Sequence, residues 1–150
     1  MERRLGERHP SLSVPLNNLG GILRGQGELT AARAAYERAL AIDRAHHGAD
    51  DPLIAYGLTG IGETALAAGD VDEAIERLER ALALRERADA EVSVYARSYT
   101  RFALARARWA AGARSQALAG ARDALAGYRS LGAGFSAQVE ELERWLAARS

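Results

Sequence analysis

The sequence predicts an all-α fold: an α-α superhelix in which three helical hairpins stack in a row and a C-terminal helix caps the last one. Three observations predict this fold. The sequence repeats itself at an interval of 42 or 43 residues, apolar residues recur at helical spacing, and a glycine stands between the two helices of each hairpin. A chain of 150 residues is long enough for such a short array.

The internal repeat appears when the sequence is shifted along itself. A shift of 42 residues places Gly20 on Gly62 and Gly27 on Gly69, and a further 43 residues place Gly69 on Gly112. The same shifts align Pro10 with Pro52, Leu16 with Leu58, Leu19 with Ile61 and Leu104, Ala32 with Ala74 and Ala117, Ala39 with Ala81 and Ala124, and Leu40 with Leu82 and Leu125. We therefore expect three repeat units.

The second half of each unit carries an apolar stripe. Its members recur mostly at intervals of three and four residues, so they share one face of a helix that must pack against a neighbour. The stripes are Leu29, Ala32, Tyr36, Ala39 and Leu40 in unit one, and Val71, Ala74, Ile75, Leu78, Ala81 and Leu82 in unit two. A similar stripe predicts a final helix that covers the last apolar face of the array: Phe135, Val139, Leu142 and Leu146.

The corners between paired helices are marked by glycine. Gly27, Gly69 and Gly112 stand where a residue with left-handed backbone ends the first helix of each unit. Asp70, followed by Glu73 three residues later, predicts a capping box at the start of the next helix.

The start of each unit is marked by proline. Pro10 and Pro52 fit the first turn of the first helix in units one and two. Because Gly6 and Pro10 recur as Gly48 and Pro52, we expect the chain to begin inside a repeat, with another unit upstream. The expected division of one array over 1–150 is a remnant at 1–8, repeats at 9–50, 51–92 and 93–131, and a capping helix at 132–150.

Composition argues against several classes of function. The chain holds 20 acidic and 20 basic residues, all of the latter arginine, so it lacks the electrostatic footprint of a protein that binds nucleic acid or an anionic membrane. It has no lysine for a Schiff base and no cysteine for a disulfide, a thiolate nucleophile or a zinc site. No apolar run approaches the roughly 20 residues that span a bilayer, and the first residues do not form a secretory signal. We expect a cytoplasmic protein.

The stretch GLTGIGETALAAGD raises the question of a nucleotide site, because glycine clusters cradle phosphate in many proteins. A phosphate loop needs a lysine after its glycines, and a dinucleotide fingerprint needs a strand before them; this sequence offers neither. Gly62 fits the close approach of two paired helices. Gly57 and Gly60 have no such role, so at these two positions we expect a bend or close contact with a bound chain.

Other candidates for chemistry have plain explanations. His46 and His47 lie near Asp50 and Asp51, but neighbouring residues on a helix point about 100° apart and cannot both face one ion. The acidic residues expected on the solvated face of the closing helix are Glu140, Glu141 and Glu143. No serine is placed near a histidine and an acid, so nucleophilic catalysis has no support. Together with the arguments on the glycine cluster and the histidines, this leads us to expect no catalytic residue, no metal site and no cofactor.

The pattern of small residues resembles the tetratricopeptide repeat. Its signature positions are occupied by Gly20, Ala32, Tyr36 and Ala39 in unit one, by Gly62, Ala74, Leu78 and Ala81 in unit two, and by Ala105, Ala117, Ala121 and Ala124 in unit three. The 42-residue period and the stretches HPSLSVPLNNLGGILRGQGEL and YERALAIDR resemble the longer, kinesin-light-chain-like branch. FALARARWAAG and ELERWLAAR are similar to arrays in large bacterial signalling proteins such as serine/threonine kinases.

Unit three departs from this pattern at two positions. Arg101 and Arg108 stand where unit two has Leu58 and Ala65. Either the first helix of unit three is rotated, or these arginines bury only their stems and place their charged ends in water.

The resemblance implies that the first helices line a concave groove. The residues then expected to face it are Asn17, Asn18, Gly21, Arg24, Tyr56, Thr59, Glu63, Tyr99, Phe102, Arg106 and Trp109. Asparagine amides would bond a peptide backbone, arginines would meet its carboxylates, and aromatic rings would hold its apolar side chains. We expect a non-catalytic protein-protein interaction module that binds a partner peptide or helix, as a fragment of a larger bacterial signalling or scaffold protein, without a nucleic-acid or membrane partner.

Alternatives remain at this point. Asn17 and Arg24 fit a plain solvated surface as well as a groove. The aromatic residues whose helical spacing also fits a core are Tyr95, Tyr99, Phe102 and Trp109. The alternative functions are self-association, in which the N-terminal edge docks on a second copy, and a nucleotide-binding enzyme that uses the cluster at 57–62.

Overall fold

The computed structural model describes residues 8–87 and 92–150, and within these ranges the chain forms helices and no strand. The α-helices are α2 (Ser13–Gly25), α3 (Leu29–His47), α4 (Ala55–Ala67), α5 (Val71–Arg85), α6 (Val94–Ala110), α7 (Arg114–Ser130) and α8 (Ser136–Ala147). Short 3-10 helices precede three of them: η1 (Pro10–Leu12), η2 (Pro52–Ile54) and η3 (Ala133–Phe135).

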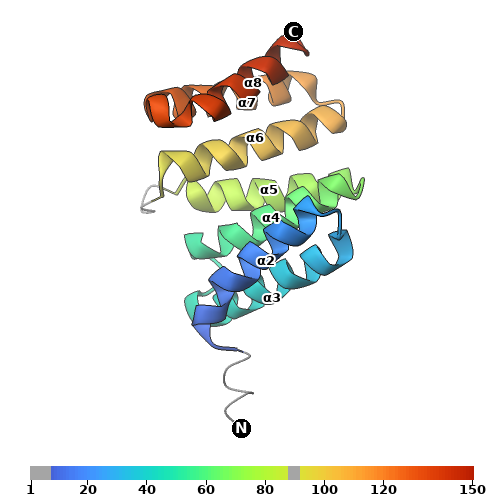
Figure 1. Ribbon diagram of the computed structural model, residues 1–150, viewed down its shortest axis with the longest axis vertical. Coiled ribbons are helices and arrows are strands. Elements are labelled where there is room, and N and C mark those ends of the chain that lie inside the picture. The colour runs from blue at the N-terminus through green and yellow to red at the C-terminus, as the bar shows by residue number, and fades with distance from the viewer. Residues whose placement is uncertain (1–7, 88–91) are drawn as a thin grey trace.

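The helices pair and stack in sequence order. α2 packs on α3, α4 on α5, and α6 on α7, and each pair also contacts the next through α3 with α4 and α5 with α6. Figure 1 shows the helices layered along the long axis, from the N-terminal end at the bottom to α8 at the top. The predicted all-α superhelix of three hairpins and a capping helix is therefore confirmed.

The corners follow the sequence prediction. Gly27, Gly69 and Gly112 have φ angles of 79°, 88° and 84°, which is the left-handed region that favours glycine. Asp70 caps α5, since its carboxylate accepts a hydrogen bond from the Glu73 amide at 3.3 Å. The carboxylate of Glu73, however, pairs with two arginines rather than completing a capping box.

Those two arginines tie neighbouring units together. Arg33 on α3 donates to Glu73 through Nη1 at 2.7 Å and Nη2 at 2.5 Å, and Arg77 lies one helical turn away with Nε at 3.6 Å. Because the bonded Arg33 favours the charged carboxylate, the pKa of Glu73 is lowered from its usual range. This ion pair joins the second helix of unit one to the second helix of unit two.

The glycine cluster in α4 is a packing surface. A Cβ atom added at Gly60 would overlap the Tyr36 ring, 2.5 Å from Cζ, and one at Gly20 would lie 2.8 Å from the same atom. At Gly57 an added Cβ would lie 3.0 Å from the Cβ of Leu40. The expectation that Gly57 and Gly60 have no packing role is therefore wrong, because both admit side chains of α3. The close contact at Gly60 is with this chain's own Tyr36.

Unit three keeps its register despite its two arginines. The guanidinium of Arg101 pairs with Glu86 at 2.7 Å, and that of Arg108 pairs with Glu79 at 3.2 Å. The neighbouring Leu104 is 1% exposed, as a core position should be. The side chains are thus partly covered while their charged ends reach carboxylates on α5 and at its C-cap. This is the second of the two arrangements considered for this helix.

The last helix covers the end of the array as predicted. Leu142 is fully buried, and Phe135, Val139 and Leu146 pack around it against the apolar residues of α6 and α7. At the other end, the predicted remnant of an earlier repeat falls almost wholly on residues 1–7, which lie outside the described residues.

Candidate functional site

A cavity of about 340 Å³ opens among α2, α4, α5 and the start of α6. We call it the inner cavity. Seven residues expected at a groove line it: Asn17, Asn18, Arg24, Tyr56, Thr59, Glu63 and Tyr99. Six further residues complete its wall: Tyr36, Gly60, Arg85, Ser93, Tyr95 and Ala96. Side chains from three successive units therefore meet around one hollow, because each unit contributes the same face of its first helix.

Glu63 is the electrostatic centre of this wall. It is 8% exposed and lies on α4, between the helices that carry its partners. Its Oε2 accepts a hydrogen bond from the Tyr99 hydroxyl at 3.0 Å and forms an ion pair with Arg24, while its Oε1 lies 3.5 Å from Arg106. One carboxylate of unit two thus binds arginines from units one and three. Arg24 and Arg106 were expected to meet a partner's carboxylates, and in the free chain they already have one.

Arg85 is the charged residue of this wall that sequence analysis did not predict. It is the last residue of α5 and is only 4% exposed. Its Nη1 bonds Thr100 Oγ1, and lies 3.4 Å from both Thr59 Oγ1 and the Ala96 carbonyl. Its guanidinium carbon lies 5.1 Å from the centroid of the Tyr56 ring. Burial lowers the pKa of Arg85 from its usual range, since desolvation disfavours the charged form.

The repeat aligns Arg85 with positions that are buried in the other two units. A shift of 43 residues places Arg85 on Tyr128, which is 2% exposed in the C-terminal core. A shift of 42 residues in the other direction places it on Asp43, which is 6% exposed. A charged residue at a position that the repeat buries is a candidate for function.

Four of the expected groove residues lie outside the wall of the inner cavity: Gly21, Phe102, Arg106 and Trp109. Phe102 is 7% exposed and packs edge-on against Trp145 of α8, with the ring centroids 5.8 Å apart. Trp109 packs on the same Trp145 at 5.9 Å. Phe102 thus takes the core arrangement that had been left open, and Trp109 is partly buried against Trp145, whereas Tyr95 and Tyr99 line the cavity.

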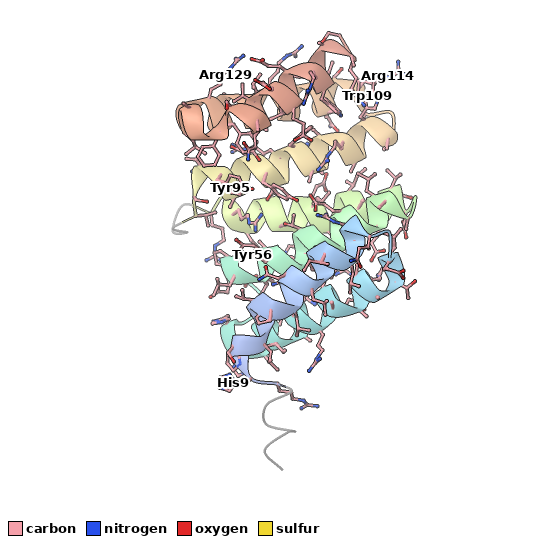
Figure 2. All side chains as sticks on the ribbon, viewed as in Figure 1. His9, Tyr56, Tyr95, Trp109, Arg114 and Arg129 are labelled. Atoms are coloured by element: carbon pink, nitrogen blue, oxygen red, sulfur yellow. The ribbon has the colours of Figure 1, made fainter. Side chains whose placement is uncertain are left out.

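The two ends of α6 therefore differ. Figure 2 shows Tyr56 and Tyr95 at one end of the helices, and Trp109 beside Arg114 at the other. The guanidinium carbon of Arg114 lies 5.4 Å from the Trp109 ring centroid, which covers that ring further. Trp109 is thus remote from the inner cavity.

A second, smaller cavity of about 250 Å³ lies between α6 and the C-terminal helices. It is lined by Tyr95, Tyr99, Phe102, Arg106, Tyr128, Gln138 and Glu141. Tyr95 packs edge-on against Tyr128, with ring centroids 5.9 Å apart. Burial raises the pKa of Tyr128 well above its usual range, so this hydroxyl stays protonated. Tyr95 and Tyr99 border both cavities and separate them.

The described residues give little scope for other sites. No group of three His, Asp or Glu side chains in this part of the chain is placed to hold a metal ion. His46 lies instead with Nε2 3.1 Å from the Arg8 carbonyl. Across 8–87 and 92–150, no helix has the length and apolar character needed to cross a membrane.

Comparison with known families decides the classification. A family model for the tetratricopeptide repeat matches residues 1–45 and 11–87, which together cover more than half of the chain. The chain belongs to the tetratricopeptide repeat family. As an array of these repeats, it is a protein-interaction module. No curated protein matches the sequence.

Solved structures place this array near the kinesin-light-chain type, as predicted. BtubC (BKLC) from P. vanneervenii is 25% identical with a TM-score of 0.74, over 83% of this chain and 50% of that one. Kinesin-light-chain-like repeats from Podosopora anserina are 22% identical with a TM-score of 0.78, over 94% and 66%. The array thus spans half of the first relative and 66% of the second.

A shorter relative was solved with a ligand. The first tetratricopeptide domain of Spaghetti (RPAP3), bound to the HSP90 peptide SRMEEVD, is 15% identical with a TM-score of 0.62. The match covers 93% of this chain and 96% of that domain. The two chains share the fold over nearly their whole lengths.

Proposed function

We propose that this array binds a partner peptide without catalysing a reaction, and that the peptide lies across the inner cavity. The observation that carries the proposal is the convergence of residues from three units, on α2, α4 and α6, around one open hollow. A rigid wall of this kind leaves only the partner to be ordered on binding, which lowers the entropic cost of the complex. The Spaghetti domain, with the same fold, was solved with a short peptide.

The wall offers the groups that an extended peptide needs. Asn17 and Asn18 can donate to and accept from the peptide backbone, whose polar groups need partners once water is displaced. Tyr56 is 62% exposed and provides a large apolar surface with a polar tip. Because the Tyr56 ring rests against Arg85, it is held in place before a ligand arrives.

The context proposed for this module comes from sequence resemblance. Its alanine- and arginine-rich third unit and closing helix are similar to arrays in large bacterial signalling proteins. We therefore propose that it serves as the interaction region of a bacterial signalling or scaffold protein in the cytoplasm. In such a role the array would recruit a partner to another domain.

A display library of random peptides tests the proposed function. We expect the native array to enrich related peptides. An Asn17→Ala/Tyr56→Ala double variant should bind them at least about tenfold more weakly, a loss of roughly 1.4 kcal/mol. Arg129→Ala is the matched control, because Arg129 pairs with Glu143 on the remote C-terminal helices. The proposal fails if no peptide is enriched, or if the double variant binds the enriched peptides as the native array does.

A specific observation favours self-association as a second function. Leu19 and Ile22 on α2 are 45% and 59% exposed. The corresponding positions of unit two, Ile61 and Thr64, are 1% and 3% exposed, and α4 packs against α3 of the preceding unit. The edge of unit one therefore presents positions that the fold buries elsewhere, and a second copy of the chain would cover them.

Light scattering over a concentration series tests self-association. The mean mass of the native array should rise with concentration toward that of a dimer. A Leu19→Ser/Ile22→Ser variant should remain monomeric, because both changes remove apolar area from the edge. Both side chains are exposed, so their replacement leaves no cavity in the core. A native array that stays monomeric throughout the series would exclude this function.

A further inference from the structure

We propose that an arginine–tryptophan cluster at the C-terminal corner of the array binds a phosphate monoester. The cluster consists of Trp109 on α6, Arg114 on α7, Trp145 on α8 and Arg149 just after α8. None of the four lines the inner cavity, and Figure 2 shows Trp109 and Arg114 at the opposite end of the helices from Tyr56. The site is therefore separate from the one proposed for a peptide and does not depend on it.

Both arginines of the cluster lie against the same indole ring. The guanidinium carbons of Arg114 and Arg149 are each 5.4 Å from the centroid of the Trp109 ring, so they are no more than twice that distance apart. The guanidinium carbon of Arg149 is also 4.2 Å from the centroid of the Trp145 ring. A ring that covers the flat face of a guanidinium leaves the N–H groups at its edge free to donate. Two cations are thus held on one ring with N–H groups still to be paired.

Neither arginine of the cluster has an anionic partner in the part of the chain that the structure describes. Arg101 and Arg108 on α6 each pair with a carboxylate, at 2.7 Å and 3.2 Å, whereas Arg114 and Arg149 form no ion pair with a described residue. Arg149 donates from Nη1 to the Trp145 carbonyl at 3.1 Å, but its Nε is buried and donates to no described residue. Because buried N–H groups are rarely left unpaired in native proteins, this atom indicates an acceptor from outside these residues.

The first turn of α7 adds positive charge beside the cluster. In unit two, Asp70 caps α5 and two acidic residues follow in its first turn. In unit three the N-cap is Ala113, and the first turn of α7 contains no acidic residue. The amides of Ser115 and Gln116 therefore meet no acceptor among the described residues. The positive end of this helix is left uncompensated, and Arg114 at its first position contributes a further positive charge.

This arrangement favours a phosphate monoester over a carboxylate. A phosphate monoester carries a charge of about −1.5 to −2 at pH 7 and three acceptor oxygens, so it can bind donors from several sides at once. A planar carboxylate matches the edge of only one guanidinium. Because Arg114 is exposed, its side chain can turn toward a phosphate that Arg149 binds. The ligand class is therefore a phosphate monoester, carried either by a phosphorylated protein side chain or by a small metabolite.

Intrinsic fluorescence tests this proposal, because the chain contains two tryptophan residues and both belong to the cluster. The probes are N-acetylphosphoserine methylamide for a protein side chain, glycerol 1-phosphate for a metabolite, and inorganic phosphate. N-acetylserine methylamide and N-acetylglutamate methylamide are the neutral and carboxylate controls. At constant ionic strength, we expect a saturable change with at least one monoester and binding of the carboxylate control at least about tenfold more weakly.

The titrations also identify the source of the phosphate, since the monoester that binds more tightly names it. The absence of a saturable change, equal binding of the carboxylate control, or a preference for inorganic phosphate over both monoesters would overturn the proposal.

The pH dependence of binding reports the charge of the bound form. A phosphate monoester gains its second negative charge as the pH rises through about 6, whereas arginine stays protonated throughout. The affinity for the preferred monoester should therefore rise several-fold between about pH 5 and about pH 7.5. An affinity that stays constant over this range would contradict a site built from two cations for a dianion.

Variants locate the site. Arg114→Gln and Arg149→Gln should each weaken binding of the preferred monoester at least about tenfold. The matched control is Arg122→Gln, because Arg122 is exposed on the same helix, lies outside the cluster and changes the net charge equally. Arg114→Gln should keep or raise the melting temperature, because it removes a cation from the positive end of α7. A folded Arg114→Gln variant that binds as the native array does would overturn the proposal, and this variant decides alone if Arg149→Gln does not fold.

Discussion

The N-terminal and C-terminal parts of the array use aromatic residues in opposite ways. Around the inner cavity, Gly20 and Gly60 remove side chains so that the Tyr36 ring sinks between two helices, and the polar residues beside it border a hollow. At the C-terminal end, Phe102 and Trp109 of α6 meet Trp145 of α8, and these rings fill the part of the interface beside the smaller cavity.

The difference shows what decides between groove and core. Tyr99, Phe102 and Trp109 lie on one helix, α6, at helical spacing, and nothing in their own sequence separates them. The last two pack because α8 brings Trp145 against them, whereas Tyr99 reaches toward Glu63 and the inner cavity. The capping helix therefore covers aromatic residues at one end of the potential groove and leaves the other end open.

The largest expected loss of stability follows from removing an aromatic ring at the C-terminal end of the array. Phe102→Ala should lower the free energy of unfolding by about 3 to 5 kcal/mol, because it removes a buried ring and leaves a cavity against α8. Chemical denaturation measures this loss. As a control, Leu53→Ala removes a side chain that is 51% exposed and should cost much less. Equal losses in the two variants would mean that the aromatic cluster is not a core.

A smaller effect is expected where glycine admits the Tyr36 ring. Gly60→Ala places a methyl group against that ring and should destabilise the array by about 1 to 3 kcal/mol. Gly120→Ala, in the middle of α7, finds its nearest neighbour at 3.8 Å and should stabilise by up to about 1 kcal/mol through helix propensity. Thermal unfolding of both variants compares them. A stabilising Gly60→Ala would show that the close packing on Tyr36 is not required.

Local features of the fold could be predicted from the sequence, because local patterns determine them. The corner at Gly69 and the cap at Asp70 depend on residues a few positions apart. The role of Gly60 could not be predicted, since it depends on how far the ring of Tyr36 reaches from another helix. Arg85 was missed for the same reason: its burial is a consequence of how α5 meets α4 and α6.

The sequence predicted which residues share the face of the candidate site, but not which of them α8 would cover. Helical spacing placed Asn17, Tyr56 and Glu63 on one side of successive helices, and all three line the inner cavity. The same reasoning placed Phe102 and Trp109 there, because no periodicity in α6 reveals where a tryptophan of α8 will fall. Whether a residue on this face lines a cavity or is buried depends on where the capping helix lies.

The most direct test of the account measures the affinity of one display-selected peptide for two variants by fluorescence anisotropy. Tyr56→Ala should weaken binding at least about tenfold and leave the melting temperature nearly unchanged, because its side chain is 62% exposed at the inner cavity. Trp109→Ala should lower the melting temperature and keep the affinity within about twofold, because its ring packs on Trp145. Loss of affinity in Trp109→Ala with native binding by Tyr56→Ala would contradict the account.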